Sequence, residues 1–90
     1  MEDGEINFYV HGEGRSAHLS YPRFIMLGEF LRNCCVNIEL DPDMVDGKIL
    51  NIMVLQDGED IQSKNAPDTA IGDVFGEGQE EIEIEFVLKI

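Results

Sequence analysis

Near the start of the chain, residues 5–11 and 15–21 are hydrophobic at every second position. A period of two is typical of strands that bury one face. We predict that a two-residue turn at Glu13-Gly14 joins these strands into a hairpin, because glycine favours such turns. The register then pairs apolar residues throughout: Val10 with Ala17, Phe8 with Leu19, and Ile6 with Tyr21. A shift by one residue would destroy this match.

A helical pattern follows the hairpin. Apolar side chains recur at intervals of three and four residues: Phe24, Leu27, Leu31, Cys34 and Cys35. Ser20 is a candidate N-cap, and Pro22 suits the first helical turn. We therefore predict a helix of about four turns that ends at or before residues 41–43. Gly28 inside this helix indicates close packing against a neighbouring segment.

The second half of the chain predicts further strands. Residues 48–56 are apolar on both parities and predict a third strand, and Asp57-Gly58 is a turn signal before a short fourth strand at residues 59–62. Residues 69–76 predict a single helical turn that tucks three apolar side chains under the sheet: Ile71, Val74 and Phe75. Residues 80–90 alternate acidic and apolar positions and predict a last strand whose even-numbered side chains fill the core.

The predicted order is hairpin, helix, strand, short strand, helical turn, strand. With the phrase at residues 68–73 and the glycine turn before residues 80–84, this order resembles the β-grasp fold of ubiquitin-like proteins. The resemblance spans nearly the whole chain and implies an α+β class with a mixed four- to five-stranded sheet packed on one helix. Residues 1–90 then form one ubiquitin-like domain, since 90 residues suffice for a single core.

The charge of the chain limits its partners. Asp and Glu number 19 against 6 Lys and Arg, which gives a formal net charge of −13. This charge repels phosphate backbones and anionic lipids, so we expect no nucleic acid and no membrane as partners, and a basic protein as the favoured one. Residues 1–5 are acidic and lack the features of a signal peptide, and the adjacent Cys34 and Cys35 do not readily bridge each other. These features predict a cytoplasmic protein.

No constellation of residues predicts catalysis, a metal site or a cofactor. The acidic segment at residues 41–47 departs from a calcium loop because Asp46 stands where glycine is needed, so we interpret it as a solvated turn. The hairpin register places Tyr9 opposite His18 on the outer face, with His11 on a diagonal, and no further ligand completes a metal set. The cysteines lack a neighbouring base. We therefore expect a protein that is not an enzyme.

The third strand supplies a candidate docking surface. Leu50, Ile52 and Val54 share one parity, and Ile49, Met53 and Leu55 share the other, so one set faces away from the helix. The sequence leaves open which set this is, and whether a loop or a second copy of the chain covers it. In ubiquitin-like domains the outer face of the sheet is the usual docking patch. The resemblance therefore implies a candidate binding set on the third and last strands, with the hairpin residues at its edge: Met53, Leu55, Val87, Tyr9, His11 and His18.

Two functions remain open at this stage. The first is a non-catalytic ubiquitin-like interaction domain or adaptor that docks a protein partner through an apolar sheet patch in an acidic surface. The alternative is a ubiquitin-like modifier or sulfur carrier, whose chemistry needs an exposed C-terminal diglycine. The sequence ends at Val87-Leu88-Lys89-Ile90 without that tail, which favours the adaptor. The identity of the partner and the oligomeric state do not follow from the sequence.

Overall fold

The computed structural model describes residues 4–55, 58–75 and 81–89. Pairs of strands are followed by pairs of helices along the chain, and the longest helix lies in the first half. The elements are β1 (Glu5–Gly12), β2 (Arg15–Pro22), α1 (Leu27–Asn37), α2 (Asp43–Asp46), β3 (Leu50–Val54), β4 (Glu59–Asp60), α3 (Ile61–Lys64), α4 (Ile71–Phe75) and β5 (Ile82–Leu88).

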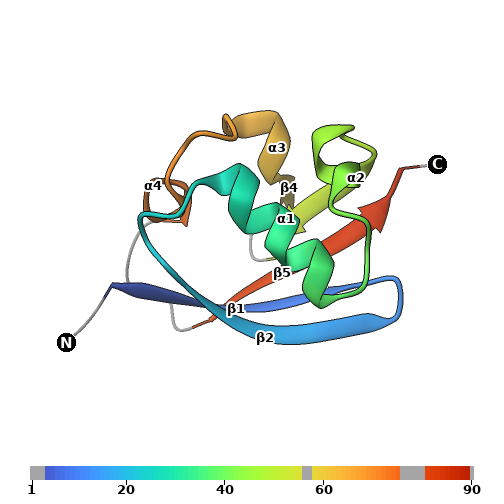
Figure 1. Cartoon of the computed structure of the whole chain (residues 1–90), viewed down its shortest axis with the longest axis horizontal. Coiled ribbons are helices and arrows are strands. Elements are labelled where there is room, and N and C mark those ends of the chain that lie inside the picture. Colours follow the sequence, from blue (N-terminus) through green and yellow to red (C-terminus); the bar gives the residue numbers. More distant parts are fainter. Residues whose placement is uncertain (1–3, 56–57, 76–80, 90) are drawn as a thin grey trace.

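The strands form one mixed sheet in the order β2-β1-β5-β3-β4. The central pair β1 and β5 is parallel, and the other neighbouring pairs are antiparallel. The helices lie together on one side of this sheet, with α1 running across it (Figure 1). A mixed sheet that wraps one main helix is the β-grasp arrangement, so the predicted fold class is confirmed, with five strands.

The N-terminal hairpin has the predicted register. Val10 pairs with Ala17, and Phe8 pairs with Leu19. The turn residues Glu13 and Gly14 both have positive φ, at 51° and 82°. Two successive positive φ values match the right-handed twist of the strands, which explains why a glycine occupies the second position.

The core lies between the sheet and α1. Even-numbered residues of β1 and β5 point toward the helix, and Phe8, Val10, Ile84 and Phe86 are fully buried. The ring centroids of Phe8 and Phe30 lie 4.5 Å apart. The alternation of the last strand therefore has the predicted role in the core, while Ile90 lies outside the described residues. No polar or charged residue of the described part is fully buried.

The predicted start of the main helix is wrong. Ser20 and Pro22 belong to β2, because the hairpin pairs them with β1, and the helix begins at Leu27. Phe24, predicted on the buried helical face, precedes the helix and is 76% exposed. Met26 is the N-cap and makes no side-chain capping bond.

The backbone of a distant loop caps α1 instead. The Leu27 N–H donates to the carbonyl of Thr69 at 2.8 Å, and the Gly28 N–H donates to that of Pro67 at 2.9 Å. Gly28 permits this contact, since a Cβ there would lie 3.2 Å from the Pro67 Cβ. The close packing predicted at Gly28 is confirmed.

Two short segments also differ from their predictions. The predicted fourth strand at residues 59–62 ends at Asp60, whose side chain accepts a hydrogen bond from the Gln62 N–H and starts α3. The acidic segment at residues 41–47 contains the helix α2, because Val45 turns inward and is buried. The predicted helical turn near residue 71 is present as α4. Asp57 of the predicted turn lies outside the described residues.

Candidate functional site

The side of the sheet that faces away from the helices carries a mixture of polar, aromatic and apolar side chains. We call it the outer face. In Figure 1 no described element lies over it. Its residues follow from strand parity and the observed registers, continued by one residue past the ends of β3 and β5: Asn7, Tyr9 and His11; Ser16, His18 and Ser20; Glu81, Glu83, Glu85, Val87 and Lys89; Ile49, Asn51, Met53 and Leu55.

Three aromatic rings meet on the hairpin part of the outer face. Tyr9 on β1 stacks on His18 of β2, with ring centroids 4.7 Å apart, as their direct pairing predicts. The Tyr9 ring also lies 5.2 Å from the His11 ring. The structure therefore brings together all three hairpin residues of the candidate binding set.

Each histidine contacts a carboxylate of the neighbouring last strand. His11 Nε2 lies 2.9 Å from Glu83 Oε2, and His18 Nδ1 lies 2.8 Å from Glu81 Oε2. An ionised carboxylate only accepts hydrogen bonds, so these ring nitrogens carry the hydrogens. The pairs form because β1 and β5 run parallel, with Tyr9 opposite Glu83.

Of the three apolar candidates, Met53 lies on β3, Val87 lies on β5, and Leu55 directly follows β3. Leu50 and Ile52 are fully buried, which shows that the parity of Met53 and Leu55 is the outward one. Leu55 is 41% exposed, whereas Met53 and Val87 are half-buried.

Acidic and polar residues separate these apolar side chains. Met53 pairs with Glu85 on one side and Asp60 on the other, and Val87 pairs with Asn51. The Leu55 N–H donates to the carbonyl of Glu83. The outer face therefore has an acidic column of Glu81, Glu83 and Glu85 that Val87 continues along β5, with the aromatic rings of the hairpin on one flank and Met53 and Leu55 on the other.

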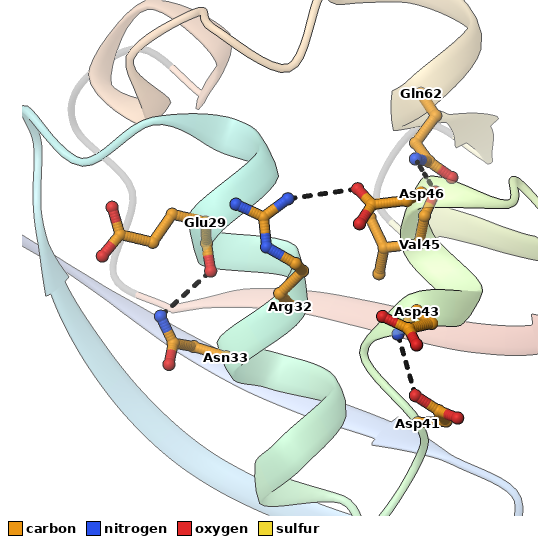
Figure 2. A network of polar contacts seen from close by, with 8 residues as sticks. All are labelled: Glu29, Arg32, Asn33, Asp41, Asp43, Val45, Asp46 and Gln62. Atoms are coloured by element: carbon orange, nitrogen blue, oxygen red, sulfur yellow. Dashed lines mark hydrogen bonds and ion pairs between the residues drawn. The ribbon is translucent and has the colours of Figure 1, made fainter.

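The opposite side of the molecule is held together by polar contacts between the helices. In Figure 2, Arg32 of α1 points toward Asp46 of α2, and its Nη1 donates to Asp46 Oδ1 at 3.1 Å. Gln62 of α3 donates from Nε2 to the Val45 carbonyl at 3.0 Å. These charged and amide groups are engaged within the fold. Three exposed apolar residues lie in α1 or just before it: Phe24, Met26 and Val36.

The two cysteines belong to the core. Cys34 and Cys35 are buried and free. Burial, reinforced by Asp41, raises the pKa of Cys35 to about 11, and burial raises the pKa of Cys34 well above its usual value. A buried thiol with a raised pKa is a poor nucleophile and a poor metal ligand.

The His, Cys, Asp and Glu residues of the described part of the chain form no group of three or more that could hold a metal ion. The helices of the same residues include none long and apolar enough to cross a membrane.

The sequence interpretation missed one part of the outer face. It placed Glu81, Glu83 and Glu85 on an acidic face of the last strand but did not connect them to the histidines. Parity alone predicts that these groups share a face. Their contact depends on the register between β1 and β5, which are separated by most of the chain.

Comparison with known proteins supports the fold. No family model matches the sequence, and no curated protein matches it. A solved structure described as "Molecular Mimicry of SUMO promotes DNA repair" is similar, with a TM-score of 0.66 and 12% sequence identity. The match covers 98% of this chain and 96% of that chain. At such low identity the likeness establishes the ubiquitin-like fold alone.

Proposed function

We propose that this protein is a non-catalytic ubiquitin-like interaction domain or adaptor. It docks a protein partner through the outer face of its sheet. The contact residues are the aromatic group Tyr9, His11 and His18 and the aliphatic group Met53, Leu55 and Val87. The aromatic group lies on one side of the acidic column, Met53 and Leu55 lie on the other, and Val87 follows the column on β5.

One observation carries this proposal: the outer face gathers the types of side chain that interfaces favour and no described element covers it. Tyrosine and methionine are enriched in interfaces, and a tyrosine ring supplies a large contact area at a low cost in conformational entropy. The Tyr9 ring is already held by two neighbouring rings. Because the fold already holds this side chain in place, binding there loses little further side-chain freedom, and the entropic cost of association is lower.

The charge of the chain supports a protein as the partner. The net charge of −13 disfavours nucleic acid and anionic lipid. We place the adaptor in the cytoplasm, because two free thiols suit a reducing compartment.

Affinity capture with matched variants tests the proposal. Met53→Asp puts a carboxylate between Glu85 and Asp60, in the middle of the surface. We expect it to reduce recovery of the wild-type partners by about tenfold or more, as substitution of a central contact residue does. Val36→Asp is the control, because Val36 is 59% exposed on α1.

The control should retain the partners. The outer face is the wrong surface if Met53→Asp recovers the wild-type set in full. It is also wrong if Val36→Asp alone loses that set. Circular dichroism of each variant separates loss of contact from loss of fold.

A further inference from the structure

A shallow hollow indents the outer face at the end of the hairpin. It has a volume of about 300 Å³ and lies between the β1–β2 turn and the last strand. Its walls include the side chains of Tyr9, His11, Ser16 and Glu85, together with the turn at residues 12–15. We call it the hairpin hollow. The pairing of His11 with Ser16 and with Glu85 places these groups in one row across the sheet.

Glu85 differs from the other two carboxylates of its strand. Glu81 and Glu83 each hold a histidine. Within the described residues, the side-chain carboxylate of Glu85 makes no hydrogen bond or ion pair, although Glu85 is half-buried. A partly desolvated carboxylate in this state gains more from a cation than a fully solvated one does.

The arginine at the hairpin hollow, Arg15, pairs with a carboxylate of this chain outside the hollow. Arg15 belongs to the rim of the hollow, and its Nη2 lies 3.4 Å from Glu39 Oε1. Gly12, its partner in the hairpin, is on the buried side of the sheet. The Arg15 guanidinium is thus paired away from the outer face.

The residues around the hairpin hollow favour a planar guanidinium as the cation. Tyr9 presents an aromatic ring, and a guanidinium stacks on such a ring while it donates in its own plane to a carboxylate. The His11 ring is fixed by its bond to Glu83, which keeps the wall in place. A volume of about 300 Å³ is at the low end for ligand pockets, roughly 300–1,000 Å³, and suits one side chain. A neutral apolar group there would desolvate Glu85 without pairing it.

We propose that the hairpin hollow receives an arginine side chain of a basic partner protein, stacked on Tyr9 and paired with Glu85. This assignment rests on the proposed function, since it names the chemistry of the partner that docks on the outer face. It accounts for the pairing of Arg15, the arginine of the hairpin, with Glu39, while the Glu85 carboxylate has no partner among the described residues.

A pair of peptides tests the assignment by NMR on the whole ¹⁵N-labelled chain. Acetyl-Gly-Arg-Gly-amide is the probe, and its citrulline counterpart has nearly the same shape without the charge. We expect the arginine peptide to shift the amide signals of Tyr9, Gly14 and Ser16 in a saturable way. The citrulline peptide should bind about tenfold more weakly, because it offers neither the cation–π contact nor the charge.

Matched charge variants separate a specific site from general attraction. Glu85→Gln should weaken the arginine peptide by about fivefold, as expected for one partly exposed ion pair. Glu29→Gln removes the same charge from the exposed first turn of α1 and should leave the affinity unchanged. The assignment is overturned by equal binding of the two peptides, by equal effects of the two variants, or by shifts located away from the hollow.

The outcome is distinguishable from failure of the proposed function. If the peptide does not bind in the hollow but Met53→Asp still loses the captured partners, the arginine site is wrong and the outer face remains the docking surface. If the peptide binds there as expected while Met53→Asp recovers the same partners as the wild type, the arginine site stands and the proposed function is wrong.

Discussion

Tyr9 shows how one residue serves the fold and the surface. Its backbone pairs on both sides in the sheet, with His18 on β2 and Glu83 on β5. Its half-buried ring packs against two imidazoles that are themselves tied to carboxylates. The ring is therefore held in place before any partner arrives, which is the condition for a low entropic cost of binding.

The buried thiols and Tyr21 make stability depend on alkaline pH. Burial, with a contribution from Cys34, raises the pKa of Tyr21 to about 12. Burial likewise raises the pKa of Cys35 from 9.0 to about 11. The unfolded chain therefore loses these protons at lower pH than the folded chain. The stabilisation is complete below about pH 9 and is lost as the pH rises toward 12.

We predict that Cys35 alone lowers the free energy of unfolding by about 2 kcal/mol between pH 8.5 and about 11, because its pKa is higher in the folded chain than in the unfolded chain. Urea unfolding at several pH values measures this, under reducing conditions. Cys35→Ala is the control, since removing the thiol should flatten the slope even if it lowers stability at every pH. An unchanged slope in that variant would assign the pH dependence to other groups.

At the scale of elements, prediction succeeded where the signal was local. The hairpin register follows from two alternating runs and one glycine turn, all within residues 5–21. The last strand follows from its alternation. The helix start was missed because α1 is capped by carbonyls of Pro67 and Thr69, which lie some forty residues along the chain. No local spacing contains that information.

The candidate site shows the same division. Parity alone predicts that Tyr9, His11 and His18 share one face of the sheet, and the observed registers confirm this prediction. The contacts of Glu81 and Glu83 with the histidines depend on the parallel pairing of the first and last strands. Whether Met53 faces outward depends on tertiary packing, because both parities of its strand are apolar.

A matched pair of substitutions tests the corrected helix start. Phe30 is fully buried among aromatic rings on α1, whereas Phe24 is 76% exposed before it. We predict that Phe30→Leu lowers the free energy of unfolding by about 1–2 kcal/mol. Phe24→Leu should change it by less than about 0.5 kcal/mol, as is usual at the surface. Urea unfolding measures both free energies. Equal losses in the two variants would mean that Phe24 is packed in the core and would contradict the helix start at Leu27.

The whole molecule is asymmetric across its sheet. On the described helix side, charged and amide groups pair with one another between elements. The outer face presents carboxylates, rings and aliphatic side chains, and among the described residues of outward parity its cationic Lys89 lies at the far end of the last strand, away from the hairpin turn. In the proposed function, the net charge of −13 steers a basic partner toward the molecule, and the outer face provides the contacts.

Hydroxyl-radical footprinting of the captured complex tests that claim most directly, because sulfur and aromatic side chains on both sides report in one experiment. On the outer face the reporters are Met53, Tyr9 and His18, and on the helix side they are Met26 and Phe24. We predict that the partner protects the outer set and leaves the helix-side set as reactive as in the free protein. Protection of Met26 and Phe24 with continued oxidation of Met53 and Tyr9 would contradict the account.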